Sequence, residues 1–247
     1  METIMLGTLQ VVASLLWWLG ISLLAERANI STTQKRSVQI ASALLLGAWL
    51  AIVYLLAQSG FFQASGAIVF AFLPAILGIF LFFSPTFAKL LSVMPMHWII
   101  GIQVFRVLGG VFLIGYAQGL LSGNFALPAG IGDVLTGITA PLVAYWSYKN
   151  GKGARLVAYL WNIFGTLDLV DALTLGALAN LQVNTEPTAA LLGALPYVLI
   201  PAFGVPRSLL LHGYTFWLLG KGRTKFGASR LSRAASRQRL SISSDSN

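Results

Sequence analysis

Seven long apolar segments alternate with short polar loops along this chain of 247 residues. Each segment is close to the ~20 residues that an α-helix needs to cross the ~30 Å apolar core of a bilayer. The expected spans are residues 3–25, 38–57, 67–87, 97–118, 127–148, 156–181 and 195–220. The pattern therefore predicts an all-α, seven-transmembrane-helix bundle that forms one membrane domain, residues 1–220, with a polar tail at 221–247.

The basic residues predict how this bundle lies in the membrane. They occur in the loops after the first, third and fifth spans and in the tail after the seventh, but in no loop after an even-numbered span. Basic loops stay in the cytoplasm, so the N-terminus is expected outside and the C-terminus inside. The basic, Ser-rich tail, 221–247, is expected to be disordered and to mark orientation, not to bind nucleic acid. The protein is expected in the cell (inner) membrane.

Composition supports the membrane class and removes several kinds of chemistry. Only 9% of the residues are charged and 57% are hydrophobic, whereas soluble domains carry ~25% charged residues. The chain has no cysteine, which excludes disulfides, thiolate catalysis, iron–sulfur clusters and Cys-based zinc sites. We expect no cofactor and no metal. An alternative in which His97 and His212 ligate one haem is weaker than the interpretation that both lie at the membrane interface.

Charged side chains inside the predicted spans are the strongest functional signal, because charge is costly within a bilayer. A helical rise of ~1.5 Å per residue places both buried arginines near the midplane and the carboxylates in the outer half, within reach of each other. With Gln103, one turn before the first arginine, they are expected to line a polar cavity open to the outside. The candidate substrate- or ion-binding residues are Gln103, Arg106, Asp133, Asp168, Asp171 and Arg207.

The charge count of this set suggests a proton carrier. Two arginines face three aspartates, so one carboxylate lacks a basic partner if all ionise. We expect Asp171, nearest the outside, to take up a proton. The last span contains Pro196, Pro201 and Pro206, and since each removes a backbone donor, this helix is expected to be kinked.

These observations favour a transporter or permeation protein for a small molecule or ion. Coupling of this transport to protons is one form of the hypothesis. The partners expected are the lipid bilayer and a small polar or ionic ligand. The alternative is a structural or partner-binding membrane protein in which the charges hold helices together, since paired Arg and Asp also tie helices to one another. Enzymatic activity is not favoured.

One short motif resembles that of an enzyme family. Residues 130–133 read Gly-Ile-Gly-Asp, which is similar to the GxGD signature of intramembrane aspartyl peptidases such as presenilins, signal peptide peptidases and prepilin peptidases. The resemblance implies Asp133 as one catalytic residue and Asp168 as its partner. In those families the second aspartate precedes the motif, whereas here it follows.

A wider resemblance covers the fourth to seventh spans. The blocks 103–110, 127–141, 161–168 and 199–212 resemble those of uncharacterised bacterial multi-pass membrane proteins. That resemblance implies a recurring membrane fold in this half of the chain and supplies no activity.

Overall fold

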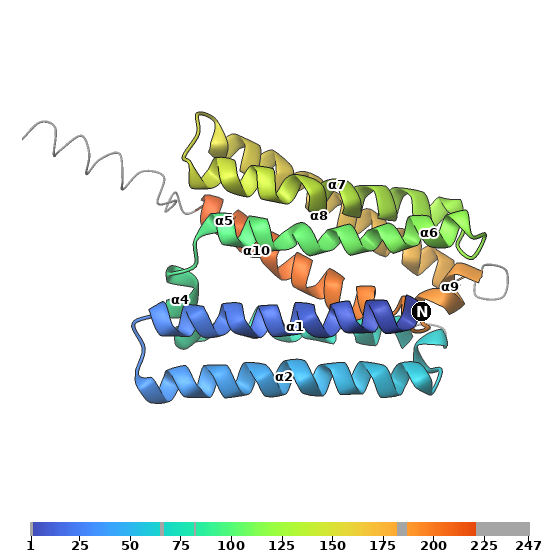
Figure 1. The fold of residues 1–247 in the computed structure, drawn as a ribbon, viewed down its shortest axis with the longest axis horizontal. Coiled ribbons are helices and arrows are strands. Elements are labelled where there is room, and N and C mark those ends of the chain that lie inside the picture. Colours follow the sequence, from blue (N-terminus) through green and yellow to red (C-terminus); the bar gives the residue numbers. More distant parts are fainter. Residues whose placement is uncertain (1, 65–66, 82, 182–186, 221–247) are drawn as a thin grey trace, which may run out of the picture.

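The computed structural model of the protein describes residues 2–64, 67–81, 83–181 and 187–220. Within these ranges every regular element is a helix (Figure 1). The predicted all-α class is therefore confirmed for the described part of the chain. The predicted tail, 221–247, lies outside the described residues.

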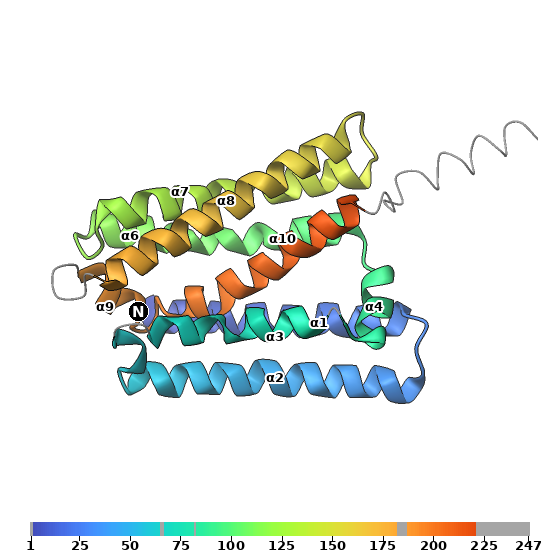
Figure 2. The same ribbon diagram turned by 180° about the vertical axis from the view of Figure 1, so that it is seen from behind.

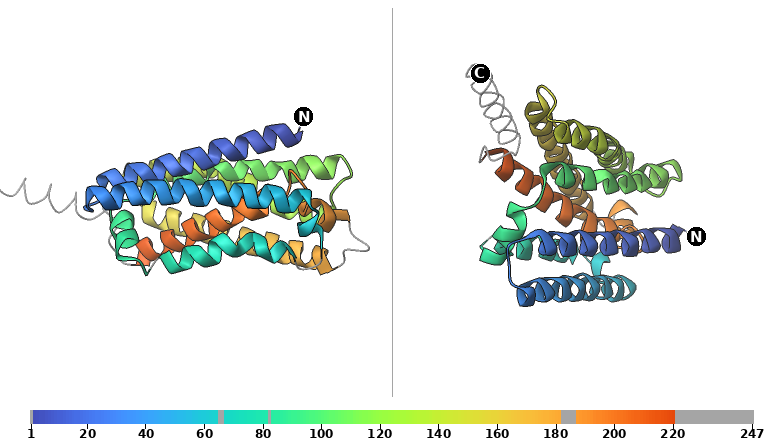
Figure 3. Two further views of the ribbon diagram at one scale, coloured as in Figure 1. Left: turned by 90° about the horizontal axis from the view of Figure 1, so that it is seen from below. Right: turned by 60° about the vertical axis from the view of Figure 1, so that its left-hand side comes forward.

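The helices form two layers, with α10 running obliquely between them (Figures 1 and 2). One layer contains α1, Glu2–Arg27, α2, Thr32–Gln58, and α3, Leu73–Leu81. The other contains α5, Met96–Gly101, α6, Val111–Ala117, α7, Gly123–Tyr148, and α8, Ala154–Leu181. α10, Val205–Gly220, contacts α8 and α5 on one side and α3 on the other. Figure 3 shows α1 and α2 close together at their connecting loop and diverging toward the N-terminus.

α2 begins six residues before its predicted start at residue 38, because its first turn is capped. The Ser31 hydroxyl accepts a hydrogen bond from the Gln34 amide, at 3.2 Å, and the Gln34 side chain accepts one from the Ser31 amide, at 3.0 Å. This reciprocal capping box satisfies two otherwise unpaired donors. The polar residues that precede the apolar run are therefore helical and not part of the loop.

The third predicted span, 67–87, is broken into shorter pieces. The 3₁₀-helix η2, Ala67–Phe72, leads into α3, and α4, Pro85–Ser92, follows after a bend of 89°. Pro85 occupies the first turn of α4, where its missing N–H costs nothing, and Ser84 caps that turn. The same proline would interrupt a continuous helix.

The fourth predicted span is helical throughout but not α-helical throughout. Between α5 and α6 the chain forms the 3₁₀-helix η3, Ile102–Gly110, which carries Arg106. Here η3 approaches α7 so closely that a Cβ on Gly137 would lie 2.6 Å from the Val107 backbone nitrogen. A long 3₁₀ stretch is uncommon and often marks a functional segment.

The proline-rich last segment starts as an irregular helix, as its composition predicts. α9, Pro187–Leu192, is followed by turns and by the π-helical turn η4, Ile200–Gly204. Regular α-helix begins only at Val205, so the predicted start at residue 195 is wrong. Proline blocks the α-helical hydrogen bond at its own nitrogen, and this segment contains Pro196 and Pro201.

Four described helices are long and apolar enough to cross a membrane, which is compatible with the predicted membrane protein. They are Thr32–Gln58, Met96–Ala117, Gly123–Tyr148 and Ala154–Ala179. A fifth is added if Val69–Leu81 and the bent continuation Pro85–Ser92 form one span. The bundle's outer surface fits lipid contact, since Leu44, Leu142 and Leu167 are each more than 60% exposed.

The loops expected to be cytoplasmic gather at one end of the bundle. In Figure 1 the α1–α2 connection, α4, the α7–α8 turn and the last turn of α10 all lie at the left-hand end. The N-terminus, the α6–α7 turn and α9 lie at the opposite end (Figures 1 and 2). This arrangement is compatible with the alternation of basic loops.

Candidate functional site

Arg106 joins two carboxylates inside the bundle. Its Nε donates to Asp133 Oδ1 of α7 at 2.7 Å, and its Nη2 donates to Asp168 Oδ2 of α8. The Arg106 side chain is 2% exposed, and those of Asp133 and Asp168 are 13% and 7% exposed. We call these three residues the Arg106 trio. With both carboxylates ionised, the trio carries one net negative charge.

The remaining nitrogen of Arg106 is also occupied. Nη1 donates to the Gly165 carbonyl of α8 at 2.9 Å and lies 3.2 Å from Nε2 of His212 in α10. All three guanidinium nitrogens thus have partners, and these partners come from α7, α8 and α10. Such a rigid, forked set of donors fixes the relative positions of the helices that accept from it.

The contact with Arg106 assigns the tautomer of His212. An arginine nitrogen has no lone pair to offer, so His212 Nε2 is the acceptor and its proton sits on Nδ1. Nδ1 lies 2.7 Å from Asn162 Oδ1, and the Asn162 amide nitrogen donates to the His212 carbonyl at 3.1 Å. His212 and Asn162 are 1% and 0% exposed. This pair therefore extends the hydrogen-bond network from α10 to α8 with a neutral imidazole.

Glycines make room for these polar side chains. A Cβ on Gly109 would overlap the Asp133 carboxylate, and a Cβ on Gly132 would overlap that of Asp168. A Cβ on Gly165 would lie 2.6 Å from His212 Cε1. Because packed helices leave little free volume, only glycine at these three positions admits the network.

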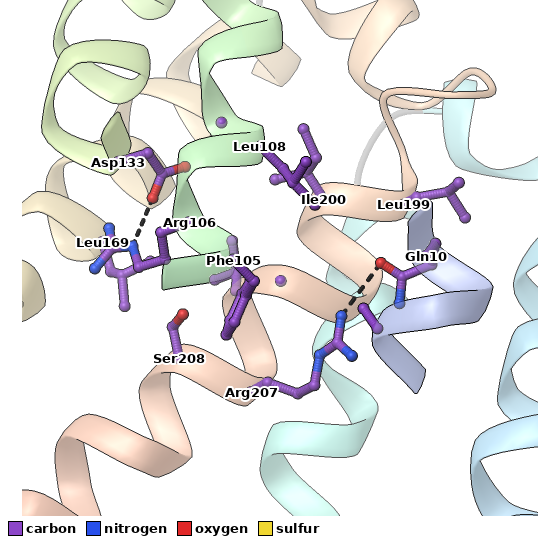
Figure 4. Close-up of a pocket in the computed structure, with 14 residues that line it drawn as sticks. Gln10, Phe105, Arg106, Leu108, Asp133, Leu169, Leu199, Ile200, Arg207 and Ser208 are labelled. Carbon is purple, nitrogen blue, oxygen red and sulfur yellow. Dashed lines mark hydrogen bonds and ion pairs between the residues drawn. The ribbon is translucent and has the colours of Figure 1, made fainter. Parts of the chain in front are cut away.

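Arg207 does not join the Arg106 trio, contrary to the expectation that both arginines face the aspartates. Its Nε donates to the Phe203 carbonyl at 2.8 Å and its Nη2 to Gln10 Oε1 of α1 at 3.2 Å. Among the described residues it has no carboxylate within salt-bridge distance. The late start of α10 places Arg207 in its first turn, pointing toward α1 (Figure 4).

Aromatic rings surround this second arginine. Its Cζ lies 5.5 Å from the Trp17 ring centroid, 5.3 Å from that of Phe105 and 5.5 Å from that of Phe203. Cation–π contacts of this kind compensate part of the charge. The residue is 8% exposed, and Nη1 has no hydrogen-bond partner among the described residues.

A cavity of about 40 Å³ lies between the two arginines. Arg106 and Asp133 are on one side of it, and Arg207 and Gln10 are on the other (Figure 4). Ser208 also lines it; this residue is 1% exposed, and its hydroxyl has no partner within the described ranges. The volume is enough for about three waters, at the ~10–15 Å³ that one requires.

Three of the predicted site residues, Gln103, Asp168 and Asp171, do not line this cavity. Asp171 is exposed on α8 and makes no ion pair with a described residue. Gln103 is fully buried, one turn before Arg106, and neither its amide oxygen nor its amide nitrogen has a partner in the part of the chain that the structure describes. The structure thus brings Arg106, Asp133 and Asp168 together, but not Asp171.

His212 and Gln10 are site residues that the sequence interpretation missed. A continuous helix from residue 196 would place His212 at the inner membrane interface. Regular helix begins only at Val205, and His212 lies beside Arg106. The signal was a polar stripe, since Ser208, His212 and Thr215 are spaced four and three apart and all buried. Gln10 and Ser14 form a similar buried pair, spaced four apart, on α1.

The histidines do not form a pair. Both ring nitrogens of His212 are engaged as described above, and the His97 ring packs on Tyr148 with centroids 5.1 Å apart. The described residues also contain no group of three or more His, Cys, Asp or Glu side chains suited to a metal ion.

Comparison with known proteins identifies a family, and no activity is assigned to that family. A search of curated proteins finds no match, and neither does a search of solved structures. A family model matches residues 64–220, which contain all four blocks noted in the sequence and the Arg106 trio. α1 and α2 lie before the matched range, although α1 supplies Gln10 to the cavity. The chain belongs to the family described as "Domain of unknown function (DUF8737)".

Proposed function

We propose that this protein is a polytopic integral membrane protein that moves a small polar or ionic solute through the cavity between Arg106 and Arg207. The observation that carries the proposal is a small cavity with a buried arginine on each side. Buried charge is expensive in a membrane and is retained mainly along ion and substrate paths. Only a small solute fits, because the cavity is about 40 Å³.

The position of the cavity supports access from the outer side. Its lining includes Ile200 and Gly204 of η4 and the first turn of α10. These segments lie nearer the end of the bundle that holds the N-terminus (Figure 2). On the topology expected from the basic loops, that end faces outward.

Within this proposal the residues have different tasks. The Arg106 trio forms a fixed wall, because every nitrogen of its guanidinium is already bonded. Arg207 meets the solute, since its Nη1 has no hydrogen-bond partner in the described part of the chain. Asp171, one helical turn from Asp168 and exposed, takes up the coupled proton.

Flux measurements in proteoliposomes test the proposal. Purified protein is reconstituted, and entry of a panel of small solutes and salts is followed by light scattering, with a pH dye inside. We expect faster entry of at least one solute than into empty liposomes, at least a tenfold loss of that flux in Arg207→Gln, and a loss of proton movement in Asp171→Asn. Arg155→Gln, at the start of α8 and outside the cavity, serves as the matched control. Equal entry into protein-containing and empty liposomes for every solute overturns the proposal.

A second candidate is a structural membrane protein, and a specific observation favours it. Arg106 of η3 is bonded to α7, α8 and α10, so the trio acts as a tie between four helical segments. In this case the polar network serves stability and the variants above leave flux unchanged.

The peptidase alternative has the weakest support. It needs Asp133 and Asp168 to share a proton, whereas both carboxylates accept from the Arg106 guanidinium. Cleavage of a model transmembrane substrate, lost in Asp133→Asn, is the result that would support it.

A further inference from the structure

We infer that Gln10 and Trp49 are positioning residues, which hold the Arg207-bearing wall of the cavity in place and thereby limit access to it. This wall, residues 200–208, consists of η4 and the first turn of α10, and we call it the Arg207 wall. Both positioning residues belong to the α1–α2 hairpin, which precedes the family match at 64–220. The inference rests on the proposed function in taking this cavity as the site, and it adds what controls that site.

The Arg207 wall is a joint between two kinds of helix. η4 is a π-helical turn, closed by a hydrogen bond from the Val205 amide to the Ile200 carbonyl, and regular α-helix follows in α10. An α-helix would pair the Ala202 carbonyl with the amide of residue 206, but Pro206 has no N–H to donate. Prolines and π-helical turns are the usual places where a helix bends. The wall therefore depends on contacts from outside its own backbone.

Trp49 of α2 supplies the donor that Pro206 lacks. Its indole Nε1 donates to the Ala202 carbonyl at 2.9 Å. Side chains of neighbouring helices commonly satisfy the carbonyls that proline frees in membrane helices. Val53, one turn further along α2, is fully buried in the apolar cluster that contains Ala202 and Phe203. α2 thus fixes the η4 end of the wall.

Gln10 of α1 holds the other end of the wall. Its Oε1 accepts from Arg207 Nη2 at 3.2 Å, beside the cavity that both residues line (Figure 4). The Gln10 amide nitrogen donates to Ser14 Oγ at 3.4 Å, which orients the amide. The Trp17 ring centroid, 5.5 Å from Arg207 Cζ, adds a second contact from the same helix. These contacts from α1 keep the guanidinium at the wall.

The hairpin therefore controls how readily a small molecule enters the cavity. The cavity is about 40 Å³, so a small displacement of one wall changes what it admits. Loss of either hydrogen bond frees one end of a proline-containing joint. Segments held by few contacts are the ones that open locally, and we expect the Arg207 wall to do so when the hairpin releases it.

Access is measured with a cysteine reporter, because the chain has no cysteine of its own. Gly204→Cys places one thiol on the cavity lining, where a Cβ meets only ordinary contacts, the nearest at 3.7 Å. Ser208→Cys, also on the lining, is the second reporter. The full chain in detergent is treated with methyl methanethiosulfonate, and the rate of thiol modification is followed by mass spectrometry.

Two tryptophan variants provide the first comparison. Trp49→Phe keeps an aromatic ring and removes the hydrogen bond to the wall, so it should raise the reporter's rate about fivefold. Trp18→Phe is the matched control, since the Trp18 indole donates to the Gln39 carbonyl at the same 2.9 Å, between residues that do not line the cavity. This control should leave the rate unchanged.

Substitutions of Gln10 separate positioning from packing. Gln10→Leu removes the acceptor for Arg207, so the reporter should react about fivefold faster. Gln10→Glu restores an acceptor oxygen, and the rate should return to that of the unaltered background or fall below it. Ser147→Cys, buried in α7 outside the cavity lining, reports general loosening and should react at one rate in every background.

Equal reporter rates in Trp49→Phe and Trp18→Phe overturn the inference, as does a Gln10→Glu protein that reacts as fast as Gln10→Leu. A parallel acceleration at Ser147→Cys also overturns it, because the hairpin would then stabilise the whole bundle instead of the wall. These measurements involve no flux, so such results leave the proposed function to the liposome assay. Conversely, the expected rates in a protein that shows no flux support the inference while overturning the proposed function.

Discussion

The carboxylate of Asp168 in α8 occupies the space that a side chain at Gly132 in α7 would fill. Gly132 belongs to the Gly-Ile-Gly-Asp motif that resembles the signature of intramembrane peptidases. In this fold its contribution is steric, since it lets α7 and α8 approach while Asp168 reaches Arg106. Packing around an ion pair thus gives this glycine a steric role.

Adding one methyl group at Gly132 should disrupt this arrangement. Gly132→Ala overlaps the Asp168 carboxylate, so the Asp168–Arg106 contact must shift or break. Overpacking of this kind costs ~1–3 kcal/mol, and we expect a clear fall in the melting temperature in detergent. Gly176→Ala is the control on the neighbouring helix, because its Cβ would meet its nearest atom at an ordinary 3.7 Å. Similar melting temperatures for the two variants would contradict the steric role.

Neutralising Arg106 should destabilise the bundle more than neutralising a surface charge. Arg106→Gln leaves two buried carboxylates without their cation, and breaking a buried pair costs ~3–5 kcal/mol. A second change, Asp168→Asn, should restore part of the loss, as a double-mutant cycle in thermal unfolding would show.

The control for this cycle is the exposed ion pair between Lys35 and Glu26, at 3.2 Å. Surface pairs contribute ~0–1 kcal/mol, so Lys35→Gln should have little effect. An Arg106→Gln protein as stable as Lys35→Gln would show that the trio is not a structural tie.

The His212 tautomer is directly observable. We expect the ¹⁵N NMR spectrum of histidine-labelled protein to show His212 protonated at Nδ1 and unprotonated at Nε2, because Nε2 accepts from Arg106. In Asn162→Leu the partner of Nδ1 is lost and the resonance of that nitrogen should shift. His97, assigned with the His97→Gln variant, is the internal reference. An Nε2-protonated His212 would mean that Arg106 does not donate to it.

The absence of cysteine from the chain makes the predicted topology easy to test. Single cysteines at Thr33 and Lys152 mark the basic end of the bundle, and those at Ser59 and Leu120 mark the other end. With a membrane-impermeant thiol reagent on intact cells, we expect labelling at positions 59 and 120 only. The unaltered chain is the unlabelled control. Labelling at 33 or 152 in sealed cells would show that the topology is the reverse of the predicted one.

Some features follow from local sequence alone. Apolar runs of about 20 residues and the alternation of basic loops predict helices and their common end, because both depend on composition within one segment. Pro196 and Pro201 predict that the last segment begins irregularly, since proline acts through its own backbone, whereas Pro128 and Pro141 lie inside the continuous helix α7.

The pairing of the buried charges does not follow from local sequence. Depth counting placed both arginines and three aspartates in adjacent layers, yet only Arg106, Asp133 and Asp168 meet. Helical depth along the membrane normal gives no information on rotation about the helix axis. Arg207 points toward α1 instead, where Gln10 lies nearly two hundred positions away in the sequence.

The sequence by itself determined the helical class, the apolar exterior and the presence of costly charges in the interior, because each is a property of residue type within one segment. The tertiary structure alone decided which of these charges pair with one another and which do not. Whether an ion pair forms depends on distances of a few ångströms between helices, and these are set by the glycine contacts and by the late start of α10.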